Sequence, residues 1–219
     1  MKGQQAIGTL VIFIALVITA ALASFVLVST TNALQSKSLA VAGKTMEKST
    51  MGFSGRAVDG WADNGSGSLD LITFQIELAP GSDTIDLNDV TIIYQAAGGT
   101  VYGEYSVKNY DPADNTTYAE TNTAALDGSS DDVIVLGDGS TITDTTTAYI
   151  VRDRTHFKKE DRYLESGELY TLVIKLPKAL EEGQDWKIIV RAPYTQDLII
   201  TGYAPEVIQA GQVVTLKSA

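Results

Sequence analysis

The residue best suited to acid–base chemistry is His156, the single histidine of the chain. It lies among acidic and basic side chains in the segment from Arg152 to Arg162. A catalytic triad needs a histidine oriented by a carboxylate beside a nucleophile. No serine stands in a Gly-x-Ser-x-Gly turn, there is no cysteine, and a Gly-x-x-x-x-Gly-Lys-[Ser/Thr] phosphate loop is absent. We therefore interpret the segment as an exposed charged loop and the chain as a protein without enzymatic activity.

Aspartates that could bind a metal ion are concentrated in one polar stretch, at Asp127, Asp131, Asp132, Asp138 and Asp144. Calcium takes carboxylate and carbonyl oxygens as ligands. Their spacing is not that of an EF-hand, and an acidic chain scatters such residues in any case. Because the chain has no cysteine, thiolate metal sites and disulfides are excluded. The sequence thus predicts no cofactor, and a bound Ca²⁺ or other cation is kept as the alternative.

Two N-glycosylation acceptors occur, at Asn64-Gly65-Ser66 and at Asn115-Thr116-Thr117. Both fall in stretches rich in Gly, Ser, Asp and Thr, which are typical of the surface loops where an accessible acceptor must lie. Such triplets also arise often by chance.

Charge is divided unevenly along the chain. The formal net charge is −11, but residues 1–50 contain four lysines and one glutamate, so the remainder carries −14. An acidic domain repels nucleic acid, and we expect no nucleic-acid partner. Segment 152–162 is locally basic, with five of the twelve Lys and Arg residues beyond residue 50. It could contact an acidic patch of a neighbouring subunit.

The longest element that the sequence predicts is an N-terminal helix. No charged residue occurs between Lys2 and Lys37, and residues 6–28 are long and apolar enough to cross a bilayer. No proline precedes Pro80, so we expect one rod of about 45 residues, near 70 Å long. The apolar region of a secretory signal peptide is shorter, about 7–15 residues, so the rod should stay on the mature chain. It should end between Thr50 and Gly55.

Small residues of the rod are spaced by four, at Ala15, Thr19 and Ala23. Such spacing places them on one face and allows helix backbones to approach closely, although alanine is also simply a good helix former. The second half of the rod is amphipathic. Three lysines of this half lie along one ribbon of the helix, Lys37, Lys44 and Lys48. This ribbon could face anionic lipid headgroups, acidic neighbouring subunits or solvent.

The rest of the chain has the pattern of a β domain. From Leu69 to Leu78, apolar and polar residues alternate with the period of a half-buried strand. Turns at Pro80-Gly81 and Gly98-Gly99 separate further strands, and residues 109–149 are predicted to be surface loop with one short strand at 133–136. We predict an α+β fold: an N-terminal helix over residues 4–52, a linker over 53–68, and an all-β antiparallel sandwich or barrel over 69–219. Strands are expected in the segments 69–78, 84–95, 101–107, 133–136, 169–176, 186–191, 198–203 and 212–217.

The N-terminal motifs resemble those of a known family. Lys2-Gly3, then Gln4 to Ala15, and then Leu34-Gln35-Ser36-Lys37 resemble the N-terminus of archaellins, the filament subunits of the archaeal flagellum. The resemblance covers roughly the first 45 residues. It implies that residues 1–3 are a leader, which a prepilin-type membrane aspartyl peptidase cuts between Gly3 and Gln4. It also raises the expectation of glycosylation at Asn64 or Asn115.

This resemblance favours a structural subunit of an extracellular archaellum filament. The helix would wait in the cell membrane and then polymerise with identical or closely related subunits. Its predicted packing residues are Ile12, Phe13, Ala15, Leu16, Thr19, Ala23 and Val26. One alternative is an archaeal type IV adhesion pilin, but Gly8 stands at the fifth mature position, where such pilins have glutamate. A monomeric membrane-anchored surface domain is the other.

Overall fold

The chain divides into two compact units, Met1–Met46 and Glu47–Ala219. In the computed structural model, the described residues are 2–62, 67–96, 98–108, 111, 113–121, 134–153, 162–209, 211 and 213–217. For residues 2–6, 46–50, 121 and 153 only the backbone is described.

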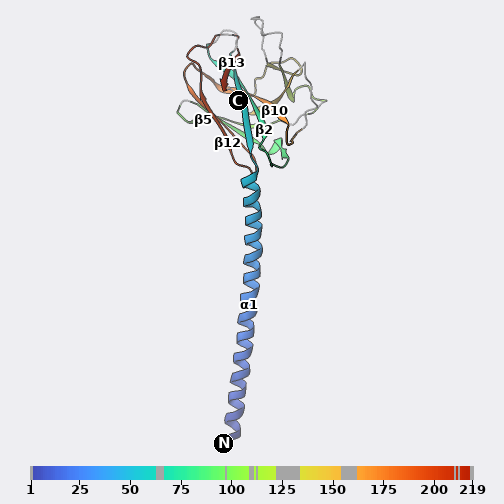
Figure 1. Cartoon of the computed structure of the whole chain (residues 1–219), viewed down its shortest axis with the longest axis vertical. Helices are drawn as coiled ribbons and strands as arrows, with labels where there is room; N and C mark the ends of the chain where they lie inside the picture. The colour runs from blue at the N-terminus through green and yellow to red at the C-terminus, as the bar shows by residue number, and fades with distance from the viewer. Residues whose placement is uncertain are drawn as a thin grey trace. The chain divides into compact units, whose positions relative to one another are not determined.

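One unbroken helix, α1, runs from Lys2 to Thr50 (Figure 1); it makes up the first unit, and its last turn belongs to the second. Forty-nine helical residues at 1.5 Å each give a length of about 74 Å. The helix ends where a Met-Gly pair begins, at the start of the interval predicted from the glycines. The prediction of a single continuous rod is therefore confirmed.

The second unit, which we call the head, is built mainly from one eleven-stranded sheet. Its main path has the order β12-β11-β4-β5-β8-β10-β2-β1-β13, and β6 and β7 extend it beside β8. Pairing is antiparallel except that β8 lies parallel to both β5 and β6. The short pair β3–β9 forms a second sheet. The strand bounds are β1 Phe53–Ala62, β2 Leu69–Leu78, β3 Ile85–Asp86, β4 Thr91–Ala96, β5 Thr100–Val107, β6 Tyr118–Thr121, β7 Ile134–Leu136, β8 Thr147–Asp153, β9 Tyr163–Leu164, β10 Leu169–Leu180, β11 Asp185–Arg191, β12 Leu198–Tyr203 and β13 Val213–Lys217, and a 3₁₀ turn, η1, covers Leu87–Asp89.

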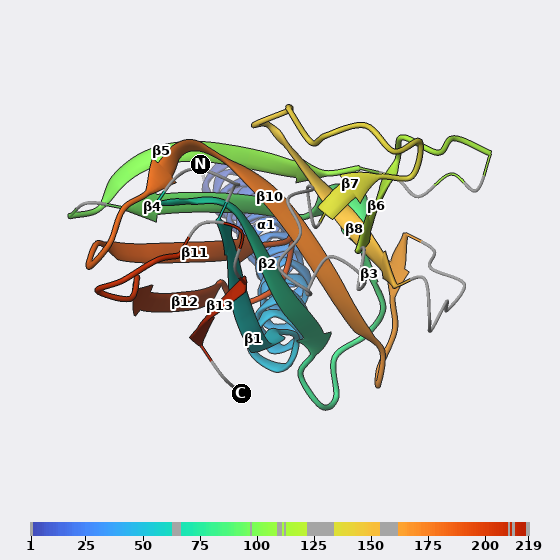
Figure 2. The same cartoon turned by 90° about the horizontal axis from the view of Figure 1, so that it is seen from above.

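The sheet curls so that its two ends approach each other. Strand β12 lies at one end of the order, yet Gly52 and Gln196 form a parallel bridge just before β1 and β12. A Cβ on Gly55 of β1 would lie 2.8 Å from Ile200 Cδ1 of β12. Figure 2 shows β12, β13 and β1 on the same side of the curled sheet. The predicted antiparallel sandwich or barrel is confirmed as a largely antiparallel curled sheet, with two parallel pairings added.

The inner face of this sheet holds the core. The residues that alternate inward on β2 and β4 are buried, as the period of two requires, and the largest fully buried side chains include Trp186, Tyr94, Tyr105 and Phe74. Tyr105 also donates a hydrogen bond to the carbonyl of Lys175, 2.7 Å away. Gly98 and Gly99 both have positive φ, which fits the tight turn predicted between β4 and β5.

Two sequence predictions are wrong in the head. Residues 53–62, assigned to a linker, form β1, which pairs with both β2 and β13. Its glycines suggested a break, but Gly60 is buried and lies against Leu69, where a Cβ would be only 2.4 Å from Cδ1. Close packing therefore explains a glycine inside this strand.

Region 109–149 was predicted to be surface loop around a single short strand. The structure also places β6 and the start of β8 there, and these strands cover a second, smaller hydrophobic cluster. Its buried members are Ala119, Ile134, Ile142, Tyr149, Val151 and Val173. The apolar positions are separated by many polar ones, so the sequence pattern alone did not reveal a core.

Candidate functional site

The largest exposed apolar surface of the chain belongs to α1. Between Ile7 and Val28, fourteen large hydrophobic side chains are 48–72% exposed. The segment Ile7–Thr45 is long and apolar enough to span a membrane, and its most apolar 18-residue window has a mean hydropathy of 2.9 with no part of it buried. Burying one such side chain is worth about 1.5–3 kcal/mol, so the whole set represents on the order of 20–40 kcal/mol. A surface of this size requires an apolar partner.

Most of the predicted packing residues share one face of α1. Counted from Ile12, the positions i+3, i+4, i+7, i+11 and i+14 lie within about a third of the helix circumference. All are exposed. Phe13 lies beside this face rather than in its centre. The residues of the face are Ile12, Ala15, Leu16, Thr19, Ala23 and Val26.

Several hydroxyl side chains of α1 are hydrogen-bonded within the helix itself. The Thr19 hydroxyl donates to the carbonyl of Ala15 at 2.7 Å, and Thr31 donates to Leu27 at the same distance. Thr30, Ser36 and Thr45 make equivalent bonds. Hydroxyls bonded in this way need no water or outside partner, so apolar neighbours can cover these positions without leaving a hydroxyl donor unpaired.

The predicted processing residues are placed only in part. Lys2, Gly3 and Gln4 belong to the first turn of α1 by backbone, and their side chains lie outside the description.

The basic segment 152–162 is also described only at its ends, and His156 falls outside the described residues. The Arg152 guanidinium lies 3.7 Å from the centre of the Tyr118 ring and 3.8 Å from Glu120. Arg162 forms a 3.0 Å ion pair with Asp86. These two arginines therefore contact their own head, and the predicted contact with another subunit is not supported by them.

The aspartates considered for metal binding serve as local turn acceptors where they are described. Asp138 Oδ1 accepts bonds from the backbone N–H and hydroxyl of Ser140, and Asp144 accepts from Thr146 and Thr147. These hydrogen bonds hold the pKa of both carboxyls below the ordinary value. Asp127, Asp131 and Asp132 lie outside the described residues. No group of three possible metal ligands is present among the residues that the structure describes.

Of the two glycosylation acceptors, Asn64 lies outside the described residues and Asn115 is exposed in the turn before β6. The Tyr118 hydroxyl donates to Asn115 Oδ1 at 3.3 Å. Thr117, two residues after the acceptor, is buried, and its hydroxyl accepts from the Asp111 N–H at 3.1 Å. Asn115 is thus held on a well-defined turn.

Comparison with known proteins decides the family. The family model of archaeal-type flagellin matches residues 3–201. The chain belongs to the archaeal-type flagellin family. This archaellin is 35% identical over 154 residues to flagellin B2 of Methanocaldococcus jannaschii, covering 68% of this chain and 69% of that protein. It is 33% identical over 137 residues to flagellin A2 of Halobacterium salinarum, covering 61% of this chain and 66% of that protein.

Two solved structures share the fold at low identity. The crystal structure of archaeal flagellin FlaB1 from M. jannaschii matches with a TM-score of 0.56 at 16% identity, covering 77% of this chain and 98% of that one. The archaeal flagellum of Methanospirillum hungatei matches with a TM-score of 0.57 at 17% identity, covering 93% and 98%. Family membership makes this archaellin a structural filament subunit of the archaellum and not an enzyme, as the sequence predicted.

Proposed function

We propose that this archaellin polymerises through α1, which leaves the cell membrane and packs among copies of itself as a dry core while the acidic heads face outward. The observation that carries the proposal is the continuous exposed apolar surface of α1 from Ile7 to Val28. Only lipid or other apolar helices could cover it along its whole length.

The exchange of lipid for neighbouring helices is energetically feasible because both are apolar surroundings. The hydrophobic effect therefore does not oppose or drive the transfer, and close packing must supply the preference for the filament. The face that contains Ala15, Thr19 and Ala23 allows such packing, since its side chains are small and the Thr19 hydroxyl is already bonded. The face thus supports tight helix–helix contact.

We further propose that the mature chain begins at Gln4, after a prepilin-type peptidase cuts the Gly3–Gln4 bond. The basic–Gly junction directly before the apolar helix supports this. Cleavage there would free the start of the rod while keeping the rod intact. We also propose Asn115 as a glycan site, because it is exposed in a turn of the head.

The processing proposal is tested by the substitution Gly3→Val. We expect wild-type fibres, sheared from cells and pelleted, to contain chains whose N-terminal residue is Gln4. In Gly3→Val the precursor should accumulate in membranes, and fibre yield should fall at least tenfold. The same change at Gly43, far from the junction and with nothing within 4 Å of its Cβ position, is the matched control. Normal fibres from Gly3→Val would disprove the junction.

A further inference from the structure

The chain segment directly after α1 is enclosed by two turns of the head. The Ala79 N–H donates to the carbonyl of Gly52 at 2.9 Å, and the Gln196 N–H donates to the carbonyl of Met51 at 3.2 Å. The Ser82 hydroxyl also accepts from the Gly52 N–H at 3.0 Å. We call residues 51–53, 79–83 and 192–199 the rim of the head.

The rim contains an open groove of about 220 Å³. Its lining comes from the segment after α1, from Ala79 and from the start of β12, and it mixes apolar side chains with polar backbone and side-chain groups, the polar groups forming the larger part of the accessible surface. Ile199 is 54% exposed there. Residues that line the groove include Met51, Phe53, Ala79, Asp197, Leu198 and Ile199.

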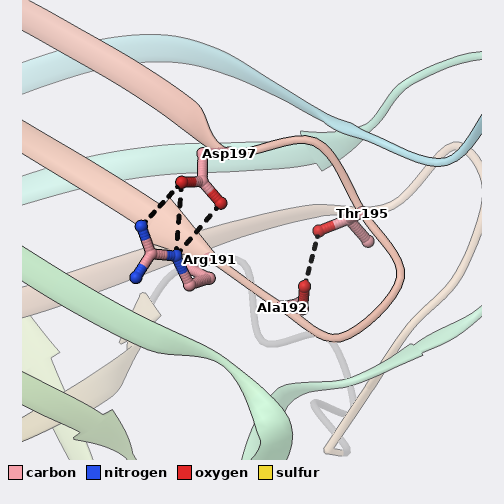
Figure 3. Close-up of polar contacts among 4 residues, drawn as sticks. All are labelled: Arg191, Ala192, Thr195 and Asp197. Atoms are coloured by element: carbon pink, nitrogen blue, oxygen red, sulfur yellow. Dashed lines mark hydrogen bonds and ion pairs between the residues drawn. The ribbon is translucent and has the colours of Figure 1, made fainter. Parts of the chain in front are cut away.

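Two residues before Gln196, which lines the groove, Tyr194 is the one non-glycine with positive φ among the described residues, at 62°. Left-handed backbone is unfavourable for a residue with a Cβ, and where it persists the surroundings must impose it. Figure 3 shows how this happens: Arg191 and Asp197 close the turn with a bidentate pair, the shortest contact being 2.8 Å, and the Thr195 hydroxyl donates to the Ala192 carbonyl at 3.0 Å. Glycine would suit this backbone better, yet the position holds a tyrosine whose side chain is 56% exposed.

The amphipathic half of α1 carries a surface complementary to this rim. Leu34, Lys37, Val41 and Lys44 follow at i, i+3, i+7 and i+10, so they form one ribbon in which aliphatic and basic side chains alternate. All four are exposed, Leu34 by 68% and Val41 by 63%. We call this set the rod ribbon.

We propose that the rim groove and Tyr194 form a docking site for the rod ribbon of a second copy of this chain. Leu34 and Val41 would contact the exposed side chain of Ile199 and the Tyr194 ring, while Lys37 and Lys44 would lie near the exposed carboxylate of Asp83. In the sequence, the rim begins at Met51, directly after the last residue of α1. The proposal rests on the proposed function, since the partner is supplied by the filament.

A photo-crosslinking amino acid, p-benzoylphenylalanine, placed at position 194 of the full chain tests the contact in assembled fibres. We expect a crosslink between chains to the tryptic peptide Ser38–Lys44, or to the peptide that ends at Lys37. The contact is refuted by crosslinks that stay within one chain, by crosslinks that reach only the heads of neighbours, or by the absence of crosslinks.

The variant Tyr194→Gly separates docking from the stability of the head. Glycine relieves the left-handed backbone, so the unfolding midpoint of the head should stay the same or rise. The midpoint temperature at which fibres dissociate should nevertheless fall by about 5 °C or more. Tyr203→Ala, which removes a 74% exposed tyrosine at the other end of β12, is the control and should leave fibre dissociation unchanged.

Two outcomes would overturn the docking site while leaving polymerisation through α1 intact: equal fibre stability in Tyr194→Gly and wild type, or an equal loss in both tyrosine variants. If the wild-type chain itself formed no fibres, the proposed function would fail instead.

A charge-swapped pair of substitutions tests the proposed position of Lys37. The variant Lys37→Glu should weaken the fibres, and Asp83→Lys added to it should restore at least part of the lost fibre stability. Failure of the pair to recover would contradict the proposed position of Lys37.

Discussion

The two units of this archaellin treat apolar side chains in opposite ways. In α1, Ile12 and Leu16 are 65% and 66% exposed, whereas in the head Ile72, Phe74 and Ile76 are completely buried. The head folds around its own core, so its strands need nothing from another molecule. The apolar surface of α1 has no counterpart within its own unit and must be completed by lipid or by other subunits. The hydrophobic core of the chain thus lies in the head, and most of its large exposed apolar side chains lie on α1.

The hydroxyl groups of α1 and of the head also differ in the acceptors to which they are hydrogen-bonded. Hydroxyls in α1 are bonded to the carbonyl one turn earlier, which leaves an apolar outer surface. In the head, the hydroxyls of Thr116, Ser140 and Thr146 instead bond to aspartates that close exposed turns. The first arrangement suits burial among helices, and the second suits contact with water.

The largest expected effect comes from filling the small-residue face of the rod. Ala15→Leu combined with Ala23→Leu should prevent close helix approach and reduce the pelletable fibre fraction by tenfold or more. Ala21→Leu, on the opposite side of the helix, should reduce it less. The fibre fraction of each variant is measured by sedimentation of material sheared from the cells, relative to the amount of the same chain found in the membrane fraction. Intact fibres from the double variant would remove the argument for a small-residue contact.

A cavity in the head should leave the rod unaffected. Phe74→Ala removes a fully buried ring, and the unfolding free energy of the head should fall by about 3–5 kcal/mol. Both tryptophans, Trp61 and Trp186, lie in the head, so fluorescence in denaturant follows the head alone.

The matched control for this cavity is Ile199→Ala, at an exposed site of β12, which should change the unfolding free energy by less than about 0.5 kcal/mol. The fraction of precursor retained in membranes should be the same in wild type, Phe74→Ala and Ile199→Ala. A parallel loss of membrane retention in Phe74→Ala would show that the two units are not independent.

The smallest expected effect is a difference in acid sensitivity. The pKa values of Asp114, Asp138 and Asp144 are lowered by hydrogen bonds from nearby hydroxyl and backbone donors. A carboxyl with a depressed folded-state pKa stabilises the fold above its unfolded pKa, near 3.8, and this stability is lost as the pH falls through the folded pKa. The head should therefore lose stability as the pH falls below about 4.

The control for acid sensitivity lies in the same chain, because residues 1–46 contain no aspartate or glutamate. Helical circular dichroism of α1 in detergent should be constant from pH 7 to pH 3, while the fluorescence midpoint of the head decreases. Asp144→Asn should make the fall of this midpoint with decreasing pH smaller, since it removes one titrating acceptor. A head whose midpoint is independent of pH would contradict the role of these aspartates.

Much of the candidate site was predictable because it depends on local sequence. A helix satisfies its own backbone hydrogen bonds, so an uncharged, proline-free run and the glycines after Thr50 were enough to define α1. The spacing of Ala15, Thr19 and Ala23 then gave their common face. The alternation from Leu69 to Leu78 gave β2 for a similar reason, since one buried face imposes a period of two.

The sequence by itself determined the long apolar rod, the interval in which the rod ends, and the strands with clear alternation. It also determined that the chain has no cysteine and therefore no disulfide or thiolate site. Tertiary structure decided that residues 53–62 become a strand, that β8 lies parallel to β5, and that Tyr194 adopts a left-handed backbone. Each of these depends on partners distant in the sequence, such as Leu69 against Gly60 or Met51 bonded to Gln196. Local propensity carries no information about such partners, because a strand is completed only by the strands beside it.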